Sequence, residues 1–280
     1  ERVLSILSGE YDMAQARFLK KEMELVEIIK SLKENSIDPI AFKGVTLSKL
    51  IYRDPGVRVS RDSDILVHPS EVDRARGVLE KKGYDIFSGS SSEDNYREHH
   101  FHYIFTRGEN MDSVVELHWS LVYAHDGHEM PRSELEKEAV EVEIMDYPVN
   151  TFSPAHYLWY LPVNLSYCYF LNFRSLLEVK HLSMSLNSEE IEITREMAGE
   201  YGTENELDMT IKVGEVLFGN FLENKVSRKF KPGFLLRHLG ITTFSPRGLL
   251  WDRTFFQDTH EMIITLLLKK GIKNKLKFMY

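Results

Sequence analysis

Apolar residues recur every three or four positions between residues 13 and 34. Among them, Phe18, Met23 and Val26 fall on one side of a helical wheel. This spacing predicts an amphipathic helix with one buried face. Residues 1–36 are therefore expected to form an N-terminal helical segment that covers another part of the fold.

The pattern changes between residues 37 and 150, where short apolar runs alternate with turn signals. Strands are expected at residues 39–42, 63–67, 84–87, 100–105 and 113–119, followed by a hairpin at residues 139–150. Helices are expected at residues 45–52 and 69–83, the second framed by Pro69 and Gly83. Strands interleaved with helices predict a domain with a mixed sheet.

From Ser153 onward the apolar spacing is helical again, and Pro154 suits the first helical position. Helices are expected at about residues 154–168, 172–186, 188–201, 203–219 and 258–270, with an irregular stretch at 220–255. The sequence therefore predicts an α+β fold, with a mixed-sheet domain at residues 37–150. A mostly helical C-terminal domain at residues 151–280 is expected to pack against it as the far wall of a cleft.

The composition is ordinary for a globular protein, with 42% hydrophobic and 28% charged residues. The single cysteine, Cys168, excludes an intramolecular disulfide and favours a reducing, cytoplasmic setting. No secretory leader is apparent. The aromatic stretch at residues 157–173 includes Pro162 and Asn164, so a buried helix is expected there and no membrane partner.

The net charge of −8 is unevenly distributed. Residues 221–280 hold 12 Lys/Arg and 4 Asp/Glu, whereas residues 1–220 hold 23 Lys/Arg and 39 Asp/Glu. A basic C-terminal segment of this kind can attract a polyanion or a nucleotide. A solvated, lysine-rich helix is the alternative, and the pattern favours it.

Two aspartates, Asp62 and Asp64, stand two residues apart at the entry to an expected strand. Strand geometry places both side chains on the same face. In a later strand, Glu116 and His118 share one face and apolar residues occupy the other. If the two strands are neighbours, Glu116 joins the aspartates as a third carboxylate.

Three clustered carboxylates repel one another unless a cation lies between them, so Asp64→Asn is expected to stabilise the metal-free protein. Oxygen ligands suit Mg²⁺ or Mn²⁺ and not Zn²⁺. Carboxylates on adjacent strands suit two-metal phosphoryl or nucleotidyl transfer. The alternatives are turn formation for the two aspartates and a solvent-facing strand position for Glu116.

Lys43 and Gly44 mark the turn between the first expected strand and the helix after it. A glycine there lets backbone amides approach phosphate at a helix N-terminus. Lys43 and Arg58 could neutralise phosphate charge, and His118 could orient a ligand or act as a base. The alternatives are a surface lysine, a salt bridge from Arg58 to one of the aspartates, and a hydrogen-bonded structural histidine.

Together these residues resemble the nucleotidyltransferase superfamily of the DNA polymerase beta type. They resemble more closely a bacterial family described as uncharacterised or putative nucleotidyltransferases. The resemblance rests on Phe42-Lys43-Gly44, Leu50-Ile51-Tyr52, Pro55-Gly56-Val57-Arg58, Asp62-Ser63-Asp64-Ile65-Leu66-Val67, Gly83-Tyr84 and Glu116-Leu117-His118-Trp119. It covers about residues 20–220 and implies a nucleotidyltransferase domain and metal-dependent chemistry.

The expected function is transfer of a nucleotidyl group from a nucleoside triphosphate, with ATP among the candidates, to an acceptor with release of pyrophosphate. The residues expected to be catalytic and to hold Mg²⁺ or Mn²⁺ are Asp62, Asp64 and Glu116. The residues expected at the nucleotide and its phosphates are Lys43, Gly44, Arg58 and His118. The acceptor stays open between protein, sugar, small molecule and RNA.

Two other functions stay open. Val45 follows Gly44 at a position where the superfamily often has serine, which leaves Thr46 or Ser48 as the substitute hydroxyl. This departure motivates a nucleotide-binding or partner-binding module with weak turnover. The third function is a metal-dependent phosphohydrolase.

Overall fold

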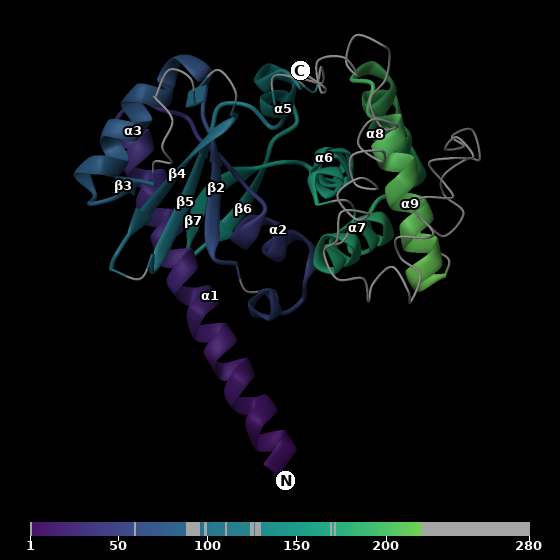
Figure 1. The fold of residues 1–280 in the computed structure, drawn as a ribbon, viewed down its shortest axis with the longest axis horizontal. Coiled ribbons are helices and arrows are strands. Elements are labelled where there is room, and N and C mark those ends of the chain that lie inside the picture. Colours follow the sequence, from purple (N-terminus) through teal and green to yellow (C-terminus); the bar gives the residue numbers. More distant parts are fainter. Residues whose placement is uncertain are drawn as a thin grey trace, which may run out of the picture. The chain divides into compact units, whose positions relative to one another are not determined.

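The computed structural model describes residues 2–58, 60–87, 96–97, 100–109, 111–123, 126, 130–168, 170 and 172–219 (Figure 1). The chain divides into two compact units. One consists of Glu1–Ala124 and Glu129–Ser153, and the other of His125–His128 and Pro154–Tyr280. The polar loop at 88–95, the irregular stretch at 220–255, the helix at 258–270 and the basic C-terminal segment were predicted from the sequence and lie outside the described residues.

The first unit is built on a five-stranded sheet in the order β1-β2-β5-β4-β3. Its strands are β1 (Ile40–Phe42), β2 (Asp62–Leu66), β3 (Asp85–Ile86), β4 (His102–Arg107) and β5 (Ser113–His118). β2 and β5 run parallel, and the other neighbours are antiparallel. A hairpin of β6 (Val140–Ile144) and β7 (Tyr147–Thr151) forms a second sheet, and β7 lies beside β1. The expected α+β fold with a mixed sheet is confirmed.

The helices of this unit are α1 (Arg2–Glu34), α2 (Gly44–Ile51), α3 (Val72–Lys81) and α5 (Arg132–Lys137), with 3-10 turns η1 (Pro55–Val57) and η2 (Pro69–Glu71). α1 begins well before residue 13, where the apolar spacing predicts a start. Residues 3–13 are exposed, so no buried face marks that part of the helix in the sequence. The helix α5 was not predicted, because six residues with a single buried side chain, Leu135, are too short to show a period.

The apolar core of the first unit lies on one face of the sheet, against α1 and α3 (Figure 1). Its members include Phe18, Leu25, Ile28, Ile29, Leu32, Ile65, Val67, Val78, Leu79, Tyr84, Tyr103, Phe105, Val115 and Leu117. Ile65 on β2 and Leu117 on β5 are fully buried. Because side chains alternate along a strand, the residues between them point to the opposite face.

The second unit consists of α6 (Pro154–Tyr167), α7 (Phe173–Ser185), α8 (Ser188–Glu200) and α9 (Glu204–Phe218). α6 contacts each of the other three helices. Its residues Tyr157, Trp159 and Tyr160 are buried, and the indole nitrogen of Trp159 donates a hydrogen bond of 2.9 Å to Thr203. Asn187 and Glu190 form a capping box at the start of α8. In the described part of the chain, no helix is both long and apolar enough to cross a membrane.

Asp208 on α9 is 7% exposed. Its burial raises the pKa from 3.8 to about 7, although the positive charges of Lys212 and Arg195 oppose the shift. Between about pH 4 and 7, the Asp208 carboxyl is therefore protonated in the folded protein and ionised in the unfolded chain. Because the folded pKa is the higher one, stability should fall as the pH rises from about 4 to 7.

We expect Asp208→Asn to raise the melting temperature at pH 8 by about 3 °C or more, since about 1–2 kcal/mol of desolvation is removed. The gain should disappear below about pH 4, where the carboxyl is protonated in both states. Thermal unfolding between pH 3.5 and 8 measures this, with the exposed Glu196→Gln on α8 as the control. A gain that is independent of pH would rule out the titration of Asp208 as its cause.

Candidate active site

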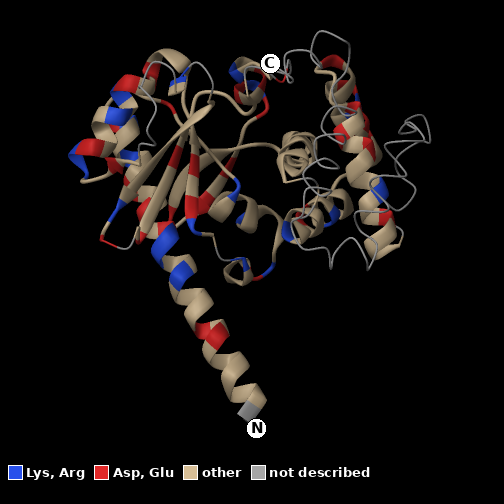
Figure 2. Ribbon diagram, in the orientation of Figure 1, with Lys and Arg blue, Asp and Glu red and all other residues tan. Residues whose placement is uncertain are grey.

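Two parallel neighbouring strands bring acidic side chains together on the sheet face opposite the core. In the register of β2 and β5, Asp64 is the direct partner of Glu116, and Phe42 on β1 is the partner of Asp64 on its other side. Asp64 is 2% exposed, and Glu116 is partly exposed. Figure 2 shows acidic positions as red segments within the strands of the sheet.

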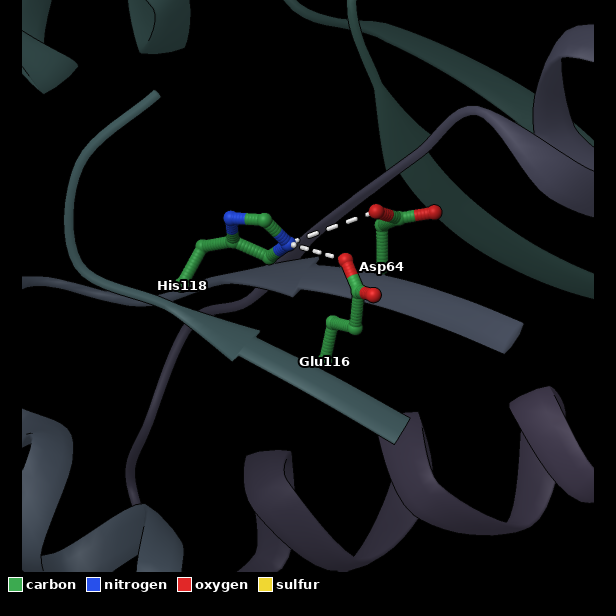
Figure 3. Close-up of side chains that lie close together, drawn as sticks. All are labelled: Asp64, Glu116 and His118. Atoms are coloured by element: carbon green, nitrogen blue, oxygen red, sulfur yellow. Dashed lines mark ion pairs between the residues drawn. The ribbon is translucent and has the colours of Figure 1, made fainter. Parts of the chain in front are cut away.

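Glu116, Asp64 and His118 converge on one point (Figure 3). The Nε2 atom of His118 lies 3.3 Å from Asp64 Oδ1 and 3.3 Å from Glu116 Oε2. Within the described residues, this is the one group of three His, Cys, Asp or Glu side chains whose ligand atoms all lie within 4.8 Å of one another. Two carboxylate oxygens and an imidazole nitrogen at this spacing fit a divalent cation.

Asp62 lies on the same face of β2 but outside that group. Its Oδ1 accepts a hydrogen bond of 2.7 Å from the hydroxyl of Ser60. The register pairs Asp62 with Val114, which lies two residues before Glu116 on the same strand face. A metal-binding role for Asp62 therefore stays a prediction.

Lys43 neutralises the buried carboxylate of Asp64. Its Nζ lies 2.9 Å from Asp64 Oδ1. Burial raises the pKa of Asp64, but the positive charge of Lys43 and the adjacent ring of His118 outweigh burial and hold this pKa below its ordinary value of 3.8. Asp64 is therefore a carboxylate at neutral pH. Lys43 is not the free surface lysine of the alternative interpretation.

The turn between β1 and α2 has an unusual backbone. Lys43 and Gly44 both have positive φ, at 55° and 39°. A Cβ added to Gly44 would lie 3.5 Å from the carbonyl oxygen of Asp62 and 3.6 Å from Ser60 Oγ, which is ordinary contact. The backbone angle and not lack of space therefore requires glycine. A non-glycine residue such as Lys43 in this region stores strain, which is common at functional sites.

The hydroxyl groups near this turn are arranged differently from the sequence-based expectation. Thr46 donates to the carbonyl of Lys43 at 3.0 Å, and Ser48 donates to the carbonyl of Gly44 at 3.0 Å. Both side chains are buried in the first turns of α2. Ser60 instead brings a hydroxyl to Gly44 from the segment that precedes β2. Sequence reasoning missed Ser60, whose only signal is its place two residues before Asp62.

Arg58 follows η1, which α1 holds in place. Asp54, at the start of η1, accepts hydrogen bonds from Tyr11 at 2.6 Å and Gln15 at 2.8 Å. Arg58 itself is 7% exposed. Its contact with phosphate stays a prediction.

His118 is fully buried among other rings. The ring of Phe42 lies 4.8 Å away edge-on, His102 stacks on it at 4.8 Å, and Phe101 lies at 5.6 Å between ring centroids. Burial lowers the pKa of His102 to about 3, so this neighbour is neutral. The rings fix the plane of the His118 imidazole, and its Nε2 faces the two carboxylates (Figure 3).

Comparison with known proteins gives a family and several distant structural likenesses. A model of the family described as uncharacterised nucleotidyltransferase matches residues 1–219. No curated protein matches the chain.

Solved structures with a similar fold include an antibiotic-resistance factor and a lincosamide antibiotic adenylyltransferase. The solution structure of the antibiotic-resistance factor ANT(2″)-Ia has 14% identity and a TM-score of 0.48, covering 65% of this chain and 94% of that one. Lincomycin-bound LnuA, a lincosamide antibiotic adenylyltransferase, has 16% identity and a TM-score of 0.41, covering 59% and 97%.

A third structure is an antigenic nucleotidyltransferase-like protein from Paracoccidioides brasiliensis. It has 14% identity and a TM-score of 0.37, covering 69% of this chain and 93% of that one. Because all three TM-scores are below 0.5, the interpretation of the site depends on the family match and on the geometry, and not on these likenesses.

Proposed function

The chain belongs to the uncharacterised nucleotidyltransferase family, and we propose that it moves a nucleotidyl group from a nucleoside triphosphate to an acceptor hydroxyl or phosphate. The acceptor oxygen would form a bond to the α-phosphorus. The bond between the α-phosphorus and the oxygen that bridges the α- and β-phosphates would break, and pyrophosphate would leave with that oxygen. The observation that carries this proposal is the direct pairing of Asp64 with Glu116 beside the Lys43-Gly44 turn.

The residues fit a divalent cation, because the buried carboxylate of Asp64 is ionised and lies with Glu116 in a group of close ligand atoms. Asp64 and Glu116 would hold the ion, with Asp62 as a third carboxylate on the same face. Mg²⁺ or Mn²⁺ suits the carboxylates. When bound, such an ion lowers the pKa of an attacking hydroxyl and neutralises the triphosphate and the departing pyrophosphate.

The remaining residues would bind and orient the triphosphate. Lys43 lies 2.9 Å from Asp64 and can shift its ammonium group to a phosphate once a cation neutralises that carboxylate. Gly44 would admit a phosphate to the N-terminus of α2, and Ser60 would offer its hydroxyl there. Arg58 would add positive charge, and Glu116 would polarise the acceptor.

A nucleotide-binding module with weak turnover is the second candidate. It is favoured by Val45, whose side chain is buried, and by the hydroxyls of Thr46 and Ser48, which bond to backbone carbonyls. Retained nucleotide binding without pyrophosphate release, in the presence of many acceptors, would support this second function.

The first experiment is an acceptor search. Each of the four nucleoside triphosphates is incubated with the protein, a divalent ion and a cell extract, and the products are analysed by mass spectrometry. An added nucleoside monophosphate mass identifies both the base and the class of acceptor, whether protein, sugar, small molecule or RNA. Acceptor-independent release of orthophosphate would instead indicate a phosphohydrolase and contradict the proposal.

Gly44→Ala should weaken nucleoside triphosphate binding by about tenfold or more. Alanine disfavours the positive φ of residue 44, so the turn should lose the backbone conformation that presents it to phosphate. The substitution should also lower stability by about 1–2 kcal/mol. Titration calorimetry and thermal unfolding measure the two effects. The control is Gly77→Ala on α3, where a Cβ meets nothing within 4 Å. If Gly44→Ala loses stability but binds nucleotide like the parent, Gly44 has no role at the phosphate.

A further inference from the structure

His118 is a buried polar side chain without a hydrogen bond. It is 0% exposed, and neither Nδ1 nor Nε2 has a hydrogen-bond partner among the described residues. A buried polar nitrogen that has given up water without gaining a hydrogen bond costs about 1–3 kcal/mol. The structural, hydrogen-bonded histidine of the alternative interpretation therefore lacks the bond that would explain it.

The orientation of this imidazole is set by the rings around it. Phe42 and Phe101 contact it from β1 and from the residue before β4, and His102 stacks on it as its direct cross-strand partner. In this position Nε2 is directed between Asp64 and Glu116 (Figure 3). The ring packing thus holds Nε2 toward two carboxylates, and imidazole nitrogen and carboxylate oxygen are both ligands of divalent ions.

The distances from His118 Nε2 to the two carboxylates match those between adjacent ligands of one ion. His118 Nε2 is 3.3 Å from Asp64 Oδ1 and 3.3 Å from Glu116 Oε2. Metal–ligand bonds of about 2.0–2.3 Å that meet at right angles place neighbouring ligand atoms about 2.8–3.3 Å apart. An ion between the three atoms would give Nε2 of His118 the partner that it lacks, and both carboxylates would help to hold that ion.

We propose that His118 Nε2 is a ligand of the metal site together with Asp64 and Glu116, so that this site takes a first-row transition-metal ion in preference to Mg²⁺. The proposal depends on the proposed function for the presence of a divalent ion between the carboxylates. Imidazole nitrogen binds transition ions well, whereas Mg²⁺ prefers oxygen ligands and retains its water. Affinity should therefore increase from Mg²⁺ to Mn²⁺ to Co²⁺.

The test measures metal binding to the full chain without nucleotide, using Mn²⁺, Co²⁺ and Mg²⁺ as probes. We expect the parent to bind Mn²⁺ at least about tenfold more tightly than Mg²⁺, and Co²⁺ more tightly than Mn²⁺. Pulsed electron paramagnetic resonance of the bound Mn²⁺ should detect a directly coordinated imidazole nitrogen. If the parent shows no nitrogen coupling, the proposal is overturned without any variant.

His118→Phe fills the same ring cluster and removes the nitrogen. It should abolish the nitrogen coupling and weaken Mn²⁺ binding by about tenfold or more, while Mg²⁺ binding changes little. His118→Gln is a second variant, which replaces the nitrogen with an amide oxygen and should lose the preference for Co²⁺ over Mg²⁺. If either folded variant keeps the metal preference of the parent, His118 is not a ligand.

His102→Phe is the matched control, because it removes the neighbouring imidazole from the opposite register position on β4. It should keep both the nitrogen coupling and Mn²⁺ affinity within about twofold of the parent. Equal losses in the two phenylalanine variants would overturn the assignment. Nitrogen-coordinated Mn²⁺ in a protein that transfers no nucleotide would contradict only the proposed function, whereas transfer without nitrogen coordination would contradict only the role of His118.

Discussion

Asp64→Asn is expected to lower nucleotidyl transfer by about 100-fold or more and to destabilise the metal-free protein by about 1–3 kcal/mol. The change preserves the shape of the side chain and removes its charge. Activity should fall because the amide cannot hold a divalent cation beside the triphosphate. Both effects have their origin in one buried oxygen, Asp64 Oδ1, which Lys43 and His118 approach together.

The sequence alone and the structure predict opposite signs for the change in stability caused by Asp64→Asn. Clustered carboxylates alone predict that Asp64→Asn relieves repulsion and stabilises the protein. In the structure, Lys43 Nζ lies 2.9 Å from Asp64, and the pKa of this carboxyl is held below 3.8 despite its burial. The structure therefore predicts the opposite sign, because the substitution leaves a partly buried ammonium group without its counter-charge.

Urea unfolding of the metal-free protein and a pyrophosphate-release assay measure the two effects. Asp85→Asn, at an exposed position of β3 in the same sheet, is the matched control and should change neither quantity appreciably. If Asp64→Asn keeps the turnover of the parent, Asp64 holds no catalytic ion. If it stabilises the metal-free protein, the pair of Lys43 with Asp64 does not govern the charge of this site.

Glu116→Gln should lower turnover to a similar degree, by about 100-fold or more, with a change in stability of less than about 0.5 kcal/mol. The Glu116 side chain is 21% exposed, and its Oε2 lies 3.3 Å from His118 Nε2. Removing its charge therefore leaves no buried cation without a partner. Glu116 and Asp64 should thus be alike in catalysis and different in stability.

Ligand-induced stabilisation measures the role of Glu116 separately from turnover. At a ligand concentration about 100 times its dissociation constant, metal plus triphosphate should stabilise the parent by about 2.7 kcal/mol. Glu116→Gln should lose most of this gain, and the exposed Glu143→Gln on β6 should keep it. If Glu116→Gln retains both the full gain and the turnover of the parent, Glu116 is only a strand residue.

The elements with a strong apolar period were predicted well from the sequence. The strand that begins at Asp62, the hairpin around Asp146 and the helices between residues 154 and 219 lie within a few residues of their predicted places. The N-terminal extension of α1 and the short helix α5 were not predicted, because neither buries a periodic apolar face. The sequence left open whether β2 and β5 are neighbours, and the register shows that they pair directly and run parallel.

The site was only partly predictable, because its charges depend on contacts that the chain order does not reveal. Alternation along β5 placed Glu116 and His118 on one face. The contact of Lys43 with Asp64 depends instead on the positive φ of Lys43. Ser60 lies near Gly44 because the chain returns to this turn 16 residues later. The lack of hydrogen bonds at His118 follows from the aromatic packing around it, and the spacing of residues in the sequence does not predict that packing.

The most direct test of nucleotidyl transfer follows each phosphate of the triphosphate. The protein is incubated with a divalent ion, an acceptor-containing extract and triphosphate labelled at either the α- or the γ-phosphate, and label is measured in the acceptor fraction and in pyrophosphate. The account predicts α-label in the acceptor and γ-label in pyrophosphate, with both signals lost in Asp64→Asn. Label from the γ-phosphate in the acceptor, or its release as orthophosphate, would contradict nucleotidyl transfer.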